Sequence, residues 1–329
     1  MRFTISAAEW NAKLAALAKV MDSKVALPIY STFLLELKDG VLRITASDMD
    51  CSRCSTLPVM DMDGANGHNG RICVTASFLL DSLKNLGDRP VTFEADEENL
   101  SVVIRYNNGR FDMVGFPAKD YVLPGTMEKN VQATIEVSVL NDSIGKSLYA
   151  VGNDDLRPVF CGIYFTKKGD ELQCAATNGS MLVRNTYKVE DDGQEYSFLL
   201  HARAAKIVHS MTSRSDEKVQ VFITDREVAF QTGTDYFRTR LIEGRYPNYN
   251  AVIPTDSDKT AIFDRNELLA AVRRVSVFAD KARCEVAMNF SGLSLSFRER
   301  ILIVPPMPKK RCFVPIKAAI CASASKRSF

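Results

Sequence analysis

Apolar and polar residues alternate along residues 156–184, on either side of a polar break at residues 168–170. Ile163 and Phe165 precede the break, and Leu172 follows it. Alternation with a period of two predicts β-strands, and a glycine between polar residues predicts a tight turn. This stretch is therefore predicted to form a β-hairpin.

The same layout occurs earlier in the chain, along residues 27–50, where Leu42 corresponds to Leu172. Three other pairs are separated by this same interval: Trp10 and Leu140, Pro117 and Pro247, and Pro124 and Pro254. Leu268 then follows Leu140 at nearly the same interval and lies in a third helical pattern. Self-similarity at a fixed period indicates tandem repeats, so the sequence predicts a triplicated domain. With equal repeats, the third copy would end roughly 45 to 50 residues beyond the last residue, which makes it incomplete.

Helical periodicity opens each predicted copy. Ser6 and Glu9 form a capping-box pattern ahead of Trp10 and Leu14, which recur at helical spacing. Further helices are predicted at 75–86, 138–151, 202–211 and 265–279, the last with Asp264 as its N-cap. We therefore expect an α+β fold in which each copy packs two helices against antiparallel strands. The predicted copies are residues 1–125, 126–254 and 255–297, followed by a tail at 298–329.

The tail at residues 298–329 differs in character from the rest of the chain. Eight of the 42 basic residues but only one of the 40 acidic residues lie in it, so the tail carries +7 and the remainder −5. Strand alternation is lost and the composition is typical of disorder, as in a linker tail. Our hypothesis is that a shifted reading frame produced it, because codons taken one base earlier are compatible with strand alternation and a glycine turn. On this hypothesis the tail is disordered and is not a DNA-binding arm.

Composition narrows the class of protein. Hydrophobic residues make up 46% and charged residues 25%, which is typical of a soluble globular protein. The sequence has neither a long apolar run nor the apolar core of a signal peptide, so we expect a cytoplasmic protein without membrane contact. Cys51 and Cys54 have the spacing of half a zinc site or of a redox pair, but no second ligand pair accompanies them. No phosphate-binding loop, dinucleotide motif or nucleophile–base set is visible, so we expect no catalysis, metal or cofactor.

Six motifs resemble those of the bacterial DNA polymerase III β subunits, the sliding clamps. They are MRFTISAAEW at 1–10, LPI at 27–29, TASDMD at 45–50, AATNGSMLV at 175–183, EGRYPNYNAVIP at 243–254 and RVSVFADK at 274–281. The resemblance covers residues 1 to about 296 and implies three clamp domains with curved antiparallel sheets. It also implies a head-to-tail homodimeric ring around duplex DNA, a processivity factor without chemistry of its own. Its implied partners are the DNA polymerase III catalytic subunit and the clamp loader.

Helices line the hole of the ring in the family that the chain resembles, and they contact DNA without reading its sequence. A sliding protein needs numerous, weak and exchangeable phosphate contacts. The candidate cations on polar helix faces are Lys13, Lys146, Lys206, Arg273 and Arg274, and Lys24 matches a basic position that contacts DNA in the family. For each of them, a solvated surface position is the alternative.

The resemblance also implies a groove between the second and third domains that binds short apolar peptides from partner proteins. The matching positions are Arg157, Phe160, Thr177, Gly179, Ser180, Met181, Leu182, Pro247, Tyr249 and Val252. Core packing is the alternative for the apolar members. Ser180 and Met181 stand where many members have a histidine–arginine pair, so we expect a different peptide preference. A third wall of the groove comes from the family's C-terminal end, which lies beyond the matching residues.

Ring closure in the family pairs a strand edge of the first domain with the third domain of the other subunit. The matching residues are Phe111 and Met113 on one side, and Val277 and Phe278 on the other. An incomplete third domain would expose sheet edges and weaken this contact. Three hypotheses therefore remain open: a ring-forming clamp, a monomeric peptide-binding adaptor with the same groove, and a redox or metal protein that uses Cys51 and Cys54.

Overall fold

The computed structural model describes residues 1–21, 27–60, 69–125, 127, 131–212, 218–253, 264–277, 286–291, 294–298 and 316–317. The chain forms two compact units, Met1–Tyr249 and Asn250–Phe329. Lys24, Phe278 and all of the predicted tail except Arg298 and Ile316–Lys317 lie outside the described residues.

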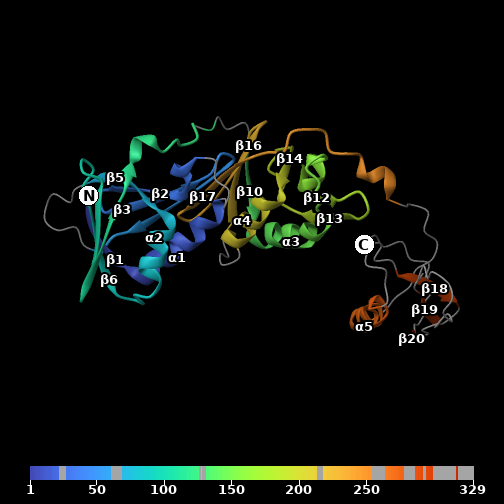
Figure 1. Ribbon diagram of the computed structural model, residues 1–329. Coiled ribbons are helices and arrows are strands. Elements are labelled where there is room, and N and C mark those ends of the chain that lie inside the picture. The colour runs from blue at the N-terminus through green and yellow to red at the C-terminus, as the bar shows by residue number, and fades with distance from the viewer. Residues whose placement is uncertain are drawn as a thin grey trace. The chain divides into compact units, whose positions relative to one another are not determined.

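The first unit contains two copies of one arrangement of helices and strands (Figure 1). Copy one consists of β1 (Arg2–Ser6), α1 (Ala7–Leu17), β2 (Thr32–Lys38), β3 (Val41–Ser47), β4 (Cys51–Pro58), β5 (Gly70–Thr75), α2 (Ala76–Lys84), β6 (Pro90–Ala95), β7 (Ser101–Tyr106), β8 (Gly109–Val114) and β9 (Phe116–Pro117). Copy two consists of β10 (Val131–Glu136), α3 (Val137–Ser147), β11 (Gly162–Lys168), β12 (Glu171–Thr177), β13 (Leu182–Lys188), β14 (Tyr196–His201), α4 (Ala202–Thr212), β15 (Lys218–Ile223), β16 (Glu227–Thr232) and β17 (Asp235–Arg240). The elements α1 and α3, β2 and β11, and β3 and β12 begin and end at the interval that separates Leu42 from Leu172, so the structure confirms the repeat predicted for copies one and two.

Helix α1 begins where its capping residue predicts. Ser6 accepts a hydrogen bond at its Oγ from the backbone N–H of Glu9 at 3.3 Å, and α1 then buries Trp10 and Leu14. Figure 1 shows α1 beside α2 and α3 beside α4, and the members of each pair pack together. The apolar stripe of each helix therefore faces its own copy's core, as the helical spacing predicts.

A nine-stranded antiparallel sheet joins the two copies. Its strand order is β10-β15-β16-β17-β4-β3-β2-β5-β9, so both copies contribute strands, and the junction is the pairing of β17 with β4. Two four-stranded sheets, β1-β6-β7-β8 and β13-β12-β11-β14, complete the unit. The apolar core of copy two also crosses the junction, because Val20 and Cys51 of copy one are buried among its residues. The predicted boundary near residue 125 thus separates two repeats that share a sheet and a core.

The two corresponding hairpins turn with glycine in different places. In copy one, Asp39 and Gly40 have φ values of +49° and +78°, the left-handed pair of an Asp-Gly hairpin turn. In copy two the order of the two residue types is reversed, and Gly169 alone takes a positive φ of +54°. Both sequences supply a residue that tolerates this conformation, and both hairpins keep the same strand lengths.

The second unit contains α5 (Arg265–Ser276) and a three-stranded sheet of β18 (Ala287–Ser291), β19 (Ser294–Arg298) and β20 (Ile316–Lys317). Asp264 caps α5 by accepting from the backbone N–H groups of Asn266 and Glu267 at 2.9 Å each, as predicted. Ile316 and Lys317 pair with Leu295 and Ser294 of β19, and the disorder predicted for the tail stays a prediction. Among the described residues, no helix is long and apolar enough to span a membrane.

Candidate functional site

The loop between β12 and β13 carries the residues predicted to form a peptide groove. Thr177 donates from Oγ1 to the carbonyl oxygen of Met181 at 2.6 Å, and the same hydroxyl accepts from the N–H of Gly179 at 3.0 Å. Asn178 accepts at Oδ1 from the N–H groups of Ser180 and Met181 at 2.9 and 2.8 Å. Side chains thus satisfy the backbone of the loop and hold it in one conformation without strand pairing.

Arg157 and Phe160 lie against this loop. The Arg157 guanidinium is 5.3 Å from the centre of the Phe160 ring, and its Nε donates to Asp154 Oδ2 at 2.8 Å. A Cβ at Gly179 would lie 3.4 Å from Arg157 Nη1, an ordinary contact distance, so the side chain of Arg157 lies next to the loop. The φ of +92° at Gly179 favours glycine at this position. Met181 is 45% exposed, while Phe160 and Leu182 are half-buried. These side chains form a surface of mixed apolar and cationic character.

Tyrosines hold the segment with Pro247 on the outer face of β12. Tyr246 is buried, stacks on Tyr164 at 4.8 Å between ring centres, and meets Tyr249 edge-on at 6.2 Å. Tyr249 Oη lies 3.2 Å from Gln173 Oε1, its hydrogen-bond partner on β12. Burial raises the pKa of Tyr246 to about 12 and that of Tyr249 in the same direction, so both phenols stay neutral near neutrality. Val252 is 71% exposed and belongs to the second unit.

The cations predicted to face DNA differ in their surroundings. Lys206 on α4 is exposed and has no ion pair among the described residues, and Arg273 and Arg274 are exposed on α5. Lys146 on α3 is 60% exposed and pairs with Asp142 at 2.6 Å, one helical turn away. Exposed cations of this kind remain available to an external phosphate, since a surface ion pair contributes little free energy.

Lys13 is engaged within the protein. Its Nζ lies 3.1 Å from Asp235 Oδ2, and Arg53 Nη2 lies 3.1 Å from Asp235 Oδ1. The Arg53 side chain is 4% exposed and also donates from Nη1 to the carbonyl oxygen of Ala16 at 2.9 Å. Asp235 begins β17 in copy two, so it binds two cations of copy one across the junction. No sequence pattern predicted this role for Asp235, because an aspartate two residues after Gly233 is typical of an ordinary turn.

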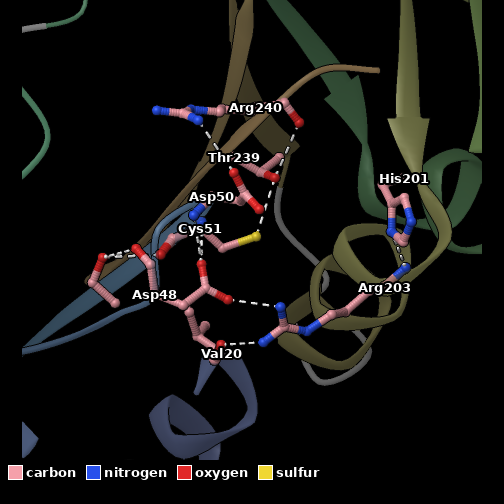
Figure 2. A network of polar contacts seen from close by, with 9 residues as sticks. Val20, Asp48, Asp50, Cys51, His201, Arg203, Thr239 and Arg240 are labelled. Carbon is pink, nitrogen blue, oxygen red and sulfur yellow. Dashed lines mark hydrogen bonds and ion pairs between the residues drawn. The ribbon is translucent and has the colours of Figure 1, made fainter. Parts of the chain in front are cut away.

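A second polar network lies at the junction, and the sequence patterns did not predict it either. Arg203, near the start of α4, donates from Nη1 to Asp48 Oδ2 at 2.6 Å and from Nη2 to the carbonyl oxygen of Val20 (Figure 2). Asp48 accepts at Oδ1 from the N–H groups of Asp50 and Cys51 at 2.8 and 2.5 Å. Arg203 of copy two is therefore bonded to Asp48 of copy one, whose turn is held by its own backbone hydrogen bonds.

Phe111 and Met113, two of the predicted ring-closing residues, lie on the edge strand of a described sheet. Phe111 and Met113 are on β8, which pairs only with β7 among the described strands. Both side chains are half-buried against the core of copy one, and Phe111 lies 5.0 Å from Tyr106 between ring centres. Their apolar side chains thus support the strand from beneath, while its outer edge is unpaired. Val277 is 78% exposed at the end of α5.

Cys51 and Cys54 do not form a redox pair in this fold. Both lie on β4, where residues three apart point to opposite faces and stand roughly 10 Å apart. Cys51 is buried, shares a hydrogen bond with Thr239 Oγ1 at 3.2 Å, and has a pKa raised to about 11 by burial. Within the described ranges, no group of three or more His, Cys, Asp or Glu residues could hold a metal ion.

Comparisons with known proteins identify the relatives of this fold. Residues 1–124 match the family model of the DNA polymerase III beta subunit, N-terminal domain, and residues 134–248 match the model of its central domain. The beta sliding clamp of Staphylococcus epidermidis is 24% identical over 299 residues, which are 90% of this chain and 79% of that protein. The clamp of Staphylococcus aureus is 24% identical over 283 residues, 85% of this chain and 74% of its own length.

Solved structures share the fold. The sliding clamp of Pseudomonas aeruginosa bound to griselimycin superposes with a TM-score of 0.90 at 20% identity, covering 97% of this chain and 84% of that one. The Bacillus subtilis clamp has a TM-score of 0.87 at 23% identity, with the same coverage. The predicted α+β clamp fold is thereby confirmed. Since two family models match most of its length, this chain belongs to the bacterial DNA polymerase III β subunit, or sliding clamp, family.

Proposed function

We propose that this chain is a DNA sliding clamp, a processivity factor that encircles duplex DNA and tethers the replicative polymerase without chemistry of its own. The observation that carries the proposal is family membership over both matched domains. The relatives and structural neighbours are themselves named sliding clamps or DNA polymerase III β subunits. Duplex DNA, the polymerase catalytic subunit and the clamp loader are the partners that this function requires.

The sheet edges support a head-to-tail ring. At the junction inside the chain, β17 of copy two pairs with β4 of copy one. The strand of copy one that corresponds to β17 is β8, and the strand of copy two that corresponds to β4 is β13. Both β8 and β13 are edge strands of their described sheets. A contact of the β17–β4 type could therefore form at either one: β8 would pair with a strand equivalent to β4, and β13 with a strand equivalent to β17. Repetition of one contact between unlike edges generates a closed ring when the rotation closes.

The helices support the DNA-binding role that follows from a ring. Lys146 and Lys206 lie exposed on α3 and α4, which pack side by side, and Arg273 and Arg274 lie exposed on α5. Long cations on helix surfaces give phosphate contacts that exchange readily and do not depend on base sequence. We include Lys24 in this set on the family resemblance alone.

The loop at residues 177–182 supports a role in binding partner peptides. Its backbone is fixed by its own side chains, Gly179 lies against Arg157 and Phe160, and the Met181 side chain is exposed. A preformed surface with apolar side chains and a few polar groups suits a short apolar peptide. We propose that Pro247 and Tyr249 belong to the same groove, and we include Val252 on the family resemblance alone.

A topological assay tests the function. The fluorescently labelled chain is loaded onto nicked circular plasmid with a bacterial clamp loader and ATP, then passed over a sizing column at high salt. A closed ring stays with the circular DNA, because a topological link does not weaken with salt as phosphate contacts do. Cutting the plasmid should then release the protein. The alternative, a monomeric peptide-binding adaptor, predicts no retention at high salt and a monomer mass, and that result would replace the ring proposal.

A further inference from the structure

A pocket of about 330 Å³ opens at the junction of copies one and two, within the first unit. Its walls include Leu27 and Met49 from copy one, Val122 and Leu123 from the segment after β9, and Arg240 from β17. Concave sites of this size are large enough for part of a peptide or a small ligand. None of these residues belongs to the groove, the cations or the sheet edges described above.

The pocket occupies the repeat-related place of the copy-two groove. One repeat interval separates Leu27, Tyr30, Ser47 and Met49 of its wall from Arg157, Phe160, Thr177 and Gly179, and also Val122 from Val252. Because β2 and β3 keep the spacing of β11 and β12, these positions lie beside corresponding strands in both copies. The backbone differs at one of them, since Gly179 has a φ of +92° and Met49 has no positive φ. All the residues that line the pocket lie in the first unit.

Apolar side chains at the pocket are unusually exposed. Leu27 is 48% exposed, Met49 62%, Val122 64% and Leu123 39%. A cluster of large apolar side chains around one concavity marks an interaction site more often than a plain surface. Burying them against an aliphatic side chain of a partner would remove apolar area from water, which favours binding.

Among the charged residues that line the pocket, Arg240 is the one available to a polar group of the ligand. Asp48 is bonded to Arg203, and Glu227 is bonded to Arg238. Arg240 has the weakest engagement of these cations: its Nη1 is 3.4 Å from Asp50 Oδ1, and the two side chains are 65% and 66% exposed. An exposed pair of this length contributes little, so the Arg240 guanidinium can bind a carboxylate from outside.

We propose that this pocket binds a short extended peptide of a partner protein that carries an aliphatic side chain next to a carboxylate. The proposal extends the peptide-binding role given above for copy two, but it rests on different side chains. Met49 stands where copy two has Gly179, and Cys51, the counterpart of Met181, is buried and bonded to Thr239. The two sites therefore select different peptides, and one chain can hold two partner segments at once.

Fluorescence anisotropy with the full chain tests the proposal. The probe is a short fluorescein-labelled peptide with two adjacent leucines and one aspartate, and its twin has asparagine in place of the aspartate. Met181→Glu first removes binding at the copy-two groove. In that background the aspartate peptide should still bind saturably, and the twin should bind roughly fivefold more weakly. Adding Arg240→Gln should erase that difference, whereas the control Arg110→Gln, at an exposed arginine of β8, should leave it unchanged.

Each outcome separates this site from the copy-two groove. Met49→Glu changes an exposed side chain, so the protein should fold normally while binding at the pocket is lost. If no saturable binding survives Met181→Glu, or if Met49→Glu leaves the surviving binding unchanged, the pocket proposal is wrong. If Met181→Glu has no effect while Met49→Glu abolishes binding, the pocket stands and the copy-two groove does not.

Discussion

Arg203 of copy two donates to Asp48 of copy one at 2.6 Å, and this contact joins two segments 155 residues apart in the chain (Figure 2). The Asp48 side chain is 9% exposed and that of Arg203 35%, so the pair lies partly out of water. Its surroundings fix both partners, since backbone N–H groups hold Asp48 and the carbonyl oxygen of Val20 holds Arg203. The pair therefore contributes to holding the copies in one unit.

Asp48→Asn should lower the free energy of unfolding by about 1–3 kcal/mol, because it removes the charge and keeps an acceptor for the turn. Arg203→Ala should cost a similar amount, and the double variant should cost less than the sum of the two. Urea unfolding followed by circular dichroism measures these differences. The matched control is Lys188→Gln, which breaks the exposed pair with Asp170 and should leave the urea midpoint nearly unchanged, because solvent screens an exposed pair. If the control and the test variants lower the free energy of unfolding equally, the Asp48–Arg203 pair contributes no more than an exposed ion pair.

His201 should make stability depend on pH. Its Nδ1 accepts from the N–H of Arg203 at 3.1 Å at the start of α4, which requires that this nitrogen carry no proton. Burial and the Arg203 charge lower the pKa of His201 below its usual value of 6.5. As the pH falls below 6.5, His201 takes up a proton in the unfolded chain before it does so in the folded protein. The contribution of neutral His201 to the free energy of unfolding is therefore complete above pH 6.5 and is lost as the pH drops below it.

His201→Asn should flatten this part of the profile, because an asparagine oxygen can cap α4 at any pH in this range. Urea midpoints measured between pH 8 and about pH 5 for both proteins give the comparison. His209→Asn, within α4, is the matched control. If the wild type and His201→Asn lose stability in parallel below pH 6.5, His201 is not the responsible group.

The helices and hairpins were predictable because short-range pattern determines them. Trp10 and Leu14 repeat at helical spacing behind the cap at Ser6, and the Asp39-Gly40 turn carries its own conformational signal. The helix predicted at 138–151 is shorter in the structure, since α3 ends at Ser147 and a tighter helical turn follows. Ends of this kind depend on packing that local spacing does not reveal.

The junction between copies was not predictable from the same patterns. It joins β4 to β17, whose residues are far apart in sequence, and each strand alone has the alternation of any half-buried strand. Asp235 and Arg53 are ordinary charged residues until this pairing brings them together. The groove residues were identified by resemblance, and the contacts of Thr177 and Asn178 that fix their loop are visible only in the structure.

Met113→Lys should weaken self-association at least tenfold if β8 is a subunit edge. The Met113 side chain packs half-buried on the core of copy one, so a lysine there would leave its charge at the rim of the core, where an added strand would cut it off further from water. Sedimentation equilibrium of the full chain over a range of concentrations gives the dissociation constant. Met60→Lys, at a side chain 63% exposed outside this edge, is the control. Circular dichroism must show that both variants fold, and an unchanged dissociation constant for a folded Met113→Lys would exclude β8 from the interface.

Lys206 and Lys13 should respond differently to removal of their charge. Lys206 is exposed on α4, so Lys206→Ala should weaken binding to duplex DNA of any sequence and reduce the slope of log affinity against log salt by about 1. Lys13 is bonded to Asp235 and 24% exposed, so Lys13→Ala should mainly lower stability, by about 1 kcal/mol. Anisotropy titrations with labelled duplex at several salt concentrations, together with urea unfolding, separate the two effects.

Lys168→Ala is the control for the DNA measurement, because Lys168 ends β11 beside a hairpin turn and lies on no helix. It should change neither the salt slope nor the stability appreciably. A salt slope lowered as much by Lys168→Ala as by Lys206→Ala would mean that net charge, and not the helix surface, governs binding. A slope lowered by Lys13→Ala without loss of stability would place Lys13 on the DNA-binding surface, because its ion pair with Asp235 would then contribute nothing to folding.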